Sequence, residues 1–159
     1  AQLAGQLGLP YAFASHFAPE LLLEALALYR REFTPSDRLA KPYAMAAINV
    51  FAADTDAEGV RLSTSMQQSF ARLSTGKPGK LPPPVDDITT VLTPQQIEGA
   101  RGRLLYSAIG GPDTVRRKLA DFIALTGVDE LMITGMAFDN AARIRSLEIV
   151  AKARQALAA

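Results

Sequence analysis

The chain has 159 residues, 48% of them hydrophobic, which suits one domain with a substantial buried core and argues against disorder. Seventeen Lys and Arg stand against sixteen Asp and Glu, so the net charge is +1, and the interspersed signs exclude a basic patch for nucleic acid or an anionic membrane surface. The absence of Cys excludes disulfides, thiolate metal sites and cysteine nucleophiles, and a single His excludes any site that needs two imidazoles.

The first part of the chain predicts two β-α units. After a short helical stretch, the apolar run at 9–17 predicts a buried strand, and Pro19 stands where a helix often begins. A second apolar run, at 43–53, predicts a strand that is buried on both faces. Thr55 and Glu58 then have the spacing of a capping box, which predicts the start of the next helix.

Residues 76–93 predict a long loop, because the three consecutive prolines at 82–84 forbid regular structure. A loop of this length inside a compact domain is often a lid over an active site, and otherwise a disordered insertion. Both interpretations stay open from the sequence.

The second part of the chain predicts two further strands with their helices. Thr93 and Pro94 open a short helix, which a strand at 105–109 follows. The next helix ends at Gly127, and residues 128–136 predict the fourth strand before a final helix.

This alternation predicts an α/β fold, because each helix must cross back over a parallel sheet. An open doubly wound sheet that binds a dinucleotide would carry a glycine-rich fingerprint after its first strand, and residues 9–19 contain none. A TIM-type barrel has eight such units in about 250 residues, so four units are half of one. We therefore predict one partial (β/α) barrel domain over residues 1–159, with 76–93 as a loop or lid insertion. The start inside a helical stretch, without Met, favours a piece of a longer protein.

The segment at 8–19, GLPYAFASHFAP, resembles the fifth strand of the bacterial luciferase-like, flavin-dependent monooxygenases. The likeness continues through the chain in the order of the family's later units. It covers the segment at 25–33, Asn49 with 52–55, the Gly-Gly-Pro helix start at 110–112, the strand at 129–132 and the helix at 143–146.

The resemblance implies the C-terminal half of a TIM-type (β/α)8 barrel that binds FMN at the carboxyl ends of its strands. It implies a monooxygenase in which O2 and reduced FMN, supplied by a flavin reductase, oxygenate a small organic substrate. It also implies that Phe13, Ala14, Ser15 and His16 lie beside the isoalloxazine ring, with His16 as the catalytic proton donor. In this family the residues around the flavin phosphate lie upstream of a position like Ala1.

Each of these side chains also has a structural interpretation. His16 could be satisfied by a neighbouring backbone group, and Ser15 could be a packing choice. Asn49 either reaches into the site or satisfies a backbone group inside its strand. The helix start at 110–112 could cradle a phosphate, although Asp113 in its first turn argues against an anion there.

Three functional hypotheses remain open. The chain is a fragment of an FMN-dependent monooxygenase, a non-catalytic flavin-binding or assembly module, or a deazaflavin-dependent oxidoreductase. Two open sheet edges of a half barrel favour a homo-oligomer or a complementing N-terminal half as partner. Without a signal peptide or an apolar run long enough to span a bilayer, we expect a cytoplasmic protein, and we expect no metal centre.

Overall fold

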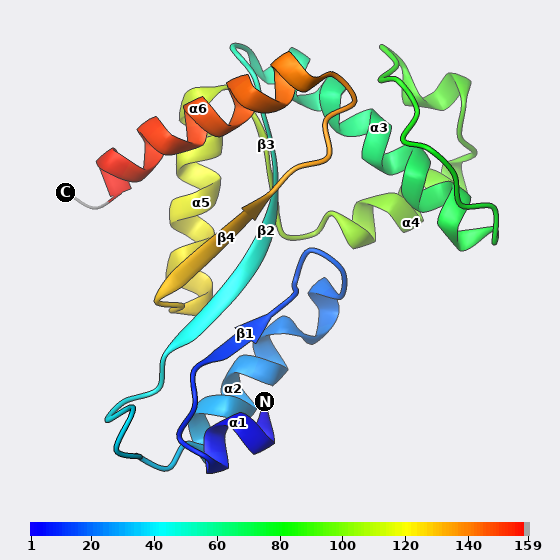
Figure 1. The fold of residues 1–159 in the computed structure, drawn as a ribbon. Helices are drawn as coiled ribbons and strands as arrows, with labels where there is room; N and C mark the ends of the chain where they lie inside the picture. Colours follow the sequence, from blue (N-terminus) through cyan, green and yellow to red (C-terminus); the bar gives the residue numbers. More distant parts are fainter. Residues whose placement is uncertain (158–159) are drawn as a thin grey trace.

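The computed structural model describes residues 1–157, in which β-strands and α-helices alternate (Figure 1). The strands are β1 (Tyr11–Phe13), β2 (Ala44–Ala52), β3 (Ser107–Gly110) and β4 (Glu130–Thr134). The α-helices are α1 (Gln2–Gln6), α2 (Leu22–Glu32), α3 (Asp56–Ser74), α4 (Pro94–Arg103), α5 (Pro112–Thr126) and α6 (Asn140–Leu157). Two 3-10 turns, η1 (Pro19–Leu21) and η2 (Ile88–Thr90), precede α2 and α4.

The long strand β2 is the centre of the sheet, and it pairs in parallel with each of the other three strands. β1 lies beside the first half of β2, with Tyr11 opposite Ala44, and β3 lies beside its end, with Ser107 opposite Asn49. β4 pairs with β2 from Met45 onward rather than with β3, so the strands do not follow one another in chain order. The predicted parallel α/β architecture is confirmed by these pairings.

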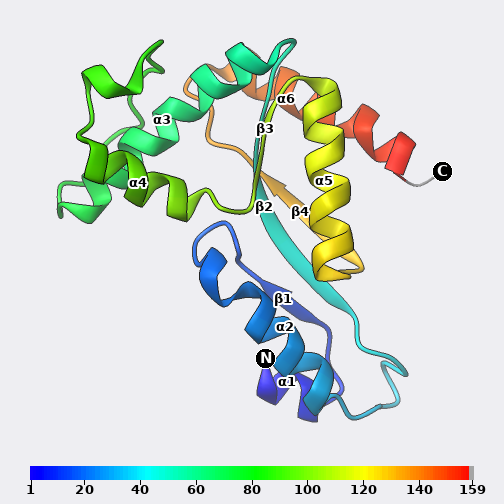
Figure 2. The same cartoon turned by 180° about the vertical axis from the view of Figure 1, so that it is seen from behind.

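One face of the sheet, the helix face, carries the larger hydrophobic core. Alternate side chains of β2, among them Ala46, Ile48 and Val50, are buried there. They belong to one cluster with side chains of three helices: Leu22, Leu26 and Tyr29 of α2; Val115, Leu119 and Phe122 of α5; and Ile149 and Ala153 of α6. Figure 2, the view from behind, shows α5 running alongside β2 and β4. Removal of these apolar surfaces from water is the main source of stability for the sheet.

The opposite face, to which Asn49 points and which we call the Asn49 face, is only partly covered. Its end at Phe51 is buried against α3 and α4, through Leu62 and Phe70 among others. Nearer the start of the sheet, Ala12 is exposed and Met132, opposite Ala47 on this face, is 52% exposed. The Asn49 face therefore leaves apolar surface accessible beside the strands.

The strand boundaries agree with the predicted ones except at the first strand. The run at 9–17 forms a strand only at Tyr11–Phe13, so the longer strand predicted there is wrong. The chain turns after Phe13, because the Ser15 amide donates to the Phe13 carbonyl and the Phe17 amide donates to the Ala14 carbonyl. The predicted strand end is consequently a tight turn, which changes the direction of the side chains that follow.

The loop at 76–93 is attached to α3 through polar contacts. The Thr64 hydroxyl accepts a hydrogen bond from the Val85 amide at 2.9 Å, and the Gln68 side chain donates to the Pro83 carbonyl at 3.0 Å. Both side chains are buried, and these bonds supply partners that burial requires. Whether the loop closes over a site stays a prediction.

Candidate functional site

The turn after β1, formed by residues 14–17, is the segment that the resemblance singles out. Ser15 is 1% exposed, and its hydroxyl donates to the Ala47 carbonyl of β2. Phe13 points to the helix face, where it packs against the main core next to Tyr11. Ala14 is exposed and His16 is partly exposed, so these two present accessible surface, whereas Phe13 and Ser15 contact the protein itself.

Asn49 connects this turn to the far side of the sheet. Its side-chain nitrogen donates to the His16 carbonyl at 3.3 Å, and its side-chain oxygen accepts from the Thr134 hydroxyl at 2.9 Å. Asn49 is 1% exposed, and Thr134 is the last residue of β4. Asn49 thus satisfies a backbone group, as one of its two interpretations predicted, and it also ties the carboxyl ends of β1 and β4 together.

His16 has an environment that favours its neutral form. The imidazole packs against the Phe17 ring with the centroids 4.4 Å apart, and the Nδ1 atom is buried without a hydrogen-bond partner among the described residues. Burial lowers the pKa of His16 below its ordinary value of 6.5. A neutral imidazole can accept a proton or donate one hydrogen bond, so the side chain can serve proton transfer near pH 7.

The start of α5, the other candidate for anion binding, is filled by a carboxylate of the protein. Asp56 accepts a hydrogen bond from the Gly111 amide at 2.7 Å and from the Thr114 hydroxyl at 3.2 Å. These bonds, that of Gly111 first, lower the pKa of Asp56. Gly110, with φ 142°, lets the chain approach so closely that a Cβ atom there would be 2.5 Å from Asp56 Oδ1. Because the Gly111 amide already donates to the Asp56 carboxylate, which would also repel an anion, this helix start does not offer a free phosphate site.

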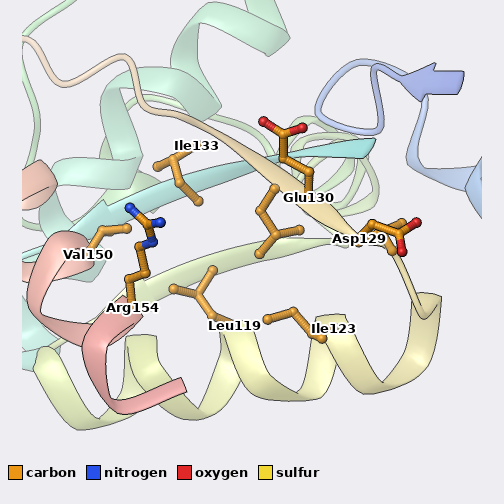
Figure 3. A pocket seen from close by; sticks show the side chains of 9 residues that line it. Leu119, Ile123, Asp129, Glu130, Ile133, Val150 and Arg154 are labelled. Atoms are coloured by element: carbon orange, nitrogen blue, oxygen red, sulfur yellow. The ribbon is translucent and has the colours of Figure 1, made fainter. Parts of the chain in front are cut away.

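A cavity of about 520 Å³ lies elsewhere, on the helix face between α5, β4 and α6 (Figure 3). Leu119, Ile123 and Val150 contribute apolar walls, and Arg154 of α6 also lines the cavity. The Asp129 carboxylate at its edge already accepts from the Ala44 amide at 2.8 Å. The cavity lies toward the start of β4, away from the carboxyl ends of the strands where sites of parallel α/β folds form, so we do not assign the chemistry to it.

Two site residues were not predicted from the sequence. Thr134 carries a hydroxyl near the end of a predicted strand, a signal comparable to that of Asn49, but its partner depends on strand pairing. Asp56 follows the predicted cap Thr55, whose hydroxyl accepts from the Glu58 amide at 3.2 Å as expected. Glu58 does not complete the capping box in return, because its carboxylate pairs with Arg61 at 2.7 Å.

Two further observations concern metal ligands and the apolar character of the helices. Within residues 1–157, no group of three side chains is placed to hold a metal ion. In the same part of the chain, no helix has the length and the apolar character that crossing a membrane requires.

Comparison with known proteins gives close relatives of about twice the length. No protein-family model matches the chain. It is 46% identical over 157 residues to "Luciferase-like monooxygenase" of Escherichia coli, which covers 99% of this chain and 47% of the relative. It is 45% identical over 151 residues to "Uncharacterized protein YvbT" of Bacillus subtilis, covering 95% of this chain and 45% of that protein. The chain spans about half the length of the curated relatives it matches.

Solved structures share the fold over nearly the whole chain. The crystal structure of apo-MsnO8 superposes with a TM-score of 0.78 at 29% identity, covering 97% of this chain and 47% of that one. A second is the oxygenating constituent of 3,6-diketocamphane monooxygenase of Pseudomonas putida in complex with FMN. Its TM-score is 0.56 at 21% identity, and the match covers 95% of this chain and 43% of that one, which shows a common fold. The second of these neighbours is a monooxygenase by name, and both are again matched over about half their length.

Proposed function

We propose, from the fit of this chain to the C-terminal half of a luciferase-like monooxygenase, that it supplies the strand-end site of a flavin-dependent monooxygenase. In this proposal O2 and reduced FMN, delivered by a flavin reductase, oxygenate a small organic substrate. The observation that supports it most is the His16 turn, which Asn49 and Thr134 hold at the carboxyl ends of parallel strands. In TIM-type barrels these ends carry the chemistry.

The residues present fit the ring of a flavin better than its phosphate. Ala14 is small and exposed, Phe17 is 63% exposed, and the buried Nδ1 of His16 lacks a partner, so a planar heteroaromatic ring finds apolar contact and one polar group here. The helices that follow β2, β3 and β4 begin at amides already bonded to Thr55, Asp56 and Asp139, respectively. α2, after β1, has no side-chain cap; it continues from η1, which carries Glu20 in its first turn. We therefore propose that the phosphate is held by residues outside this chain.

Bound reduced flavin would supply the electrons that activate O2. The chain's own residues would position the reacting groups and transfer a proton. Ser15 and Asn49 hold the turn on β2, and the neutral His16 ring, as the catalytic residue we propose, accepts or returns a proton at an imidazole nitrogen. Ala14 beside it would give the ring close access to the backbone, with Phe13 and Ser15 supporting this surface from within. The loop at 76–93 would exclude water as a lid.

A partner is part of the proposal because apolar surface stays accessible at one end of the sheet. Around the connection from β4 to α6, five large apolar side chains are each about half exposed: Met132, Met136, Phe138, Ile144 and Leu147. Surfaces of this kind are typical of contact sites. We propose that a complementing N-terminal half or a second copy of the chain covers them. A cytoplasmic location, which suits a protein without Cys, belongs to the same proposal.

A second candidate function is a flavin-binding or assembly module without turnover. The capped helix starts favour it, because a chain that lacks a free phosphate site would hold flavin only with help from a partner. A deazaflavin in place of FMN, with hydride transfer instead of oxygenation, is an alternative on the same surface.

The test is a titration of the chain with FMN, followed by flavin fluorescence, alone and after addition of an N-terminal half taken from the Escherichia coli relative. The monooxygenase proposal expects binding and O2 uptake only in the reconstituted pair, and expects His16→Ala to lower O2 uptake. Binding without O2 uptake, by the chain alone or by the reconstituted pair, supports the module. Preference for a deazaflavin in a parallel titration supports the third hypothesis, and no binding of either cofactor by the pair refutes all three.

A further inference from the structure

Asn49 is a polar side chain in a strand that is otherwise apolar, AMAAINVFA, and it is buried. An amide in such a place destabilises a protein unless its polar atoms find partners. Both ends of the Asn49 amide are bonded, one to the His16 carbonyl and the other to the Thr134 hydroxyl. Neither bond belongs to the backbone pairing of the sheet. Their role therefore depends on the two segments that they join.

The two partners lie far from Asn49 in sequence, 33 positions before it and 85 after it. Both lie at the carboxyl end of a strand, one in the turn after β1 and one at the end of β4. A side chain with a merely local role would bond within its own strand or its adjacent loop. The Asn49 amide instead clamps the turn that presents the His16 ring.

The turn is held to β2 at two consecutive positions. Ser15 is fixed by its hydroxyl on the Ala47 carbonyl, and His16 is fixed by its carbonyl on Asn49. The His16 ring itself packs against Phe17, and its Nδ1 has no partner in the described part of the chain. The position of the ring therefore depends on the main chain of the turn and on the packing against Phe17, and Asn49 is the side chain that holds this main chain at residue 16.

We infer that Asn49 and Thr134 are positioning residues, which together fix the backbone of the His16 turn so that the imidazole faces the ligand side. As a statement about the reaction, this inference rests on the proposed function; as a statement about the turn, it does not. Thr134 orients the amide by donating to its oxygen, which leaves the amide nitrogen free to donate to the His16 carbonyl. Because the amide is oriented from one end and binds with the other, removal of the Thr134 hydroxyl alone should loosen the turn.

His16 is the only histidine of the chain, so its Cε1–Hε1 group gives one proton–carbon NMR signal without overlap from another imidazole. We would record this signal against pH for the unaltered chain, Thr134→Val, Asn49→Leu and Ser107→Ala. Ser107→Ala is the matched control, because Ser107 lies opposite Asn49 in register and its hydroxyl has no partner among the described residues. Circular dichroism would establish that each variant is folded.

In the unaltered chain the signal should titrate below 6.5, because the ring is partly buried. In Thr134→Val and Asn49→Leu the midpoint should move up toward 6.5 as the ring becomes solvated, while Ser107→Ala leaves it in place. If Asn49→Leu does not fold, Thr134→Val carries the test alone. An unchanged midpoint and chemical shift in folded Thr134→Val would overturn the inference.

The consequence for the reaction is measured in the pair reconstituted with an N-terminal half. Thr134→Val should lower kcat about 10-fold to 100-fold with little change in the FMN dissociation constant, as expected when a group is misplaced rather than removed. If the pair binds no flavin but the His16 signal shifts in the variants, the proposed function is refuted and the inference about the turn stands. If the pair is active and Thr134→Val changes neither the His16 signal nor kcat, the positioning role of Asn49 and Thr134 is refuted and the proposed function stands.

Discussion

Gly59→Ala tests the close approach of α3 to Gly110, the last residue of β3. A Cβ atom at residue 59 would lie 2.6 Å from both the Cα and the amide nitrogen of Gly110, and 2.8 Å from its carbonyl oxygen. All three are backbone atoms, so rotation of a side chain cannot relieve the contact. Overpacking of this kind destabilises proteins by about 1–3 kcal/mol, and we expect the upper end here. Ala in a helix interior offsets about 1 kcal/mol of this, so the net loss of unfolding free energy should be about 2 kcal/mol.

The assay is urea denaturation followed by circular dichroism, with Gly99→Ala as the matched control. Gly99 also lies inside a helix, α4, but a Cβ atom there would have no neighbour within 4 Å. Gly99→Ala should therefore stabilise the chain by up to about 1 kcal/mol. The reasoning is refuted if Gly59→Ala stabilises the chain as much as Gly99→Ala does.

Three further substitutions have expected outcomes of a different kind. Ser15→Ala leaves the buried Ala47 carbonyl without its side-chain donor and should lower the unfolding free energy by about 1–2 kcal/mol in the same urea assay. Tyr29→Phe removes the acceptor of the Tyr43 amide, bonded at 3.0 Å, and should cost about 1–3 kcal/mol; equal midpoints would contradict the role of this bond. Asp56→Asn should lower the Tm at pH 7, because the folded protein favours the charged carboxylate. Since the pKa of Asp56 is lowered, its stabilisation is present above pH 3.8 and disappears as the pH falls through the lowered value. Thermal scans should show a smaller Tm difference at about pH 2 than at pH 7, and a constant difference would count against the assignment.

The elements of the fold were predictable where the apolar pattern is long. The run at 43–53 became β2, and Thr93 with Pro94 opened α4, where Gln96 completes a capping box. The strand predicted at 9–17 was too long, because apolar and aromatic residues run through the whole segment. In the structure the chain turns after Phe13, and the Ser15 hydroxyl donates to the Ala47 carbonyl of β2.

The place of the candidate residues along the chain was predictable, whereas their hydrogen bonds were not, and their role stays a prediction. Chain order placed His16 at the end of the first strand, and the polar Asn49 inside the second was recognised as unusual. The bonds that unite them with Thr134 depend on β4 lying beside β2, a pairing between segments about 85 residues apart that local periodicity does not encode. In the same way, the sequence showed the glycines before α5 but not that Asp56, from α3, accepts a hydrogen bond from the Gly111 amide.

The position of β2 between the other strands has a consequence for the way the chain opens. β1, β3 and β4 each hydrogen-bond to β2, and no pairing among these three strands is recorded within residues 1–157. None of them can keep its ladder once β2 has left, whereas any one of them can detach without disturbing the other two ladders. Amide exchange should therefore be slowest along residues 45–49, where β2 has β4 on one side, and the short β1 should exchange through local fraying well before the rest of the sheet.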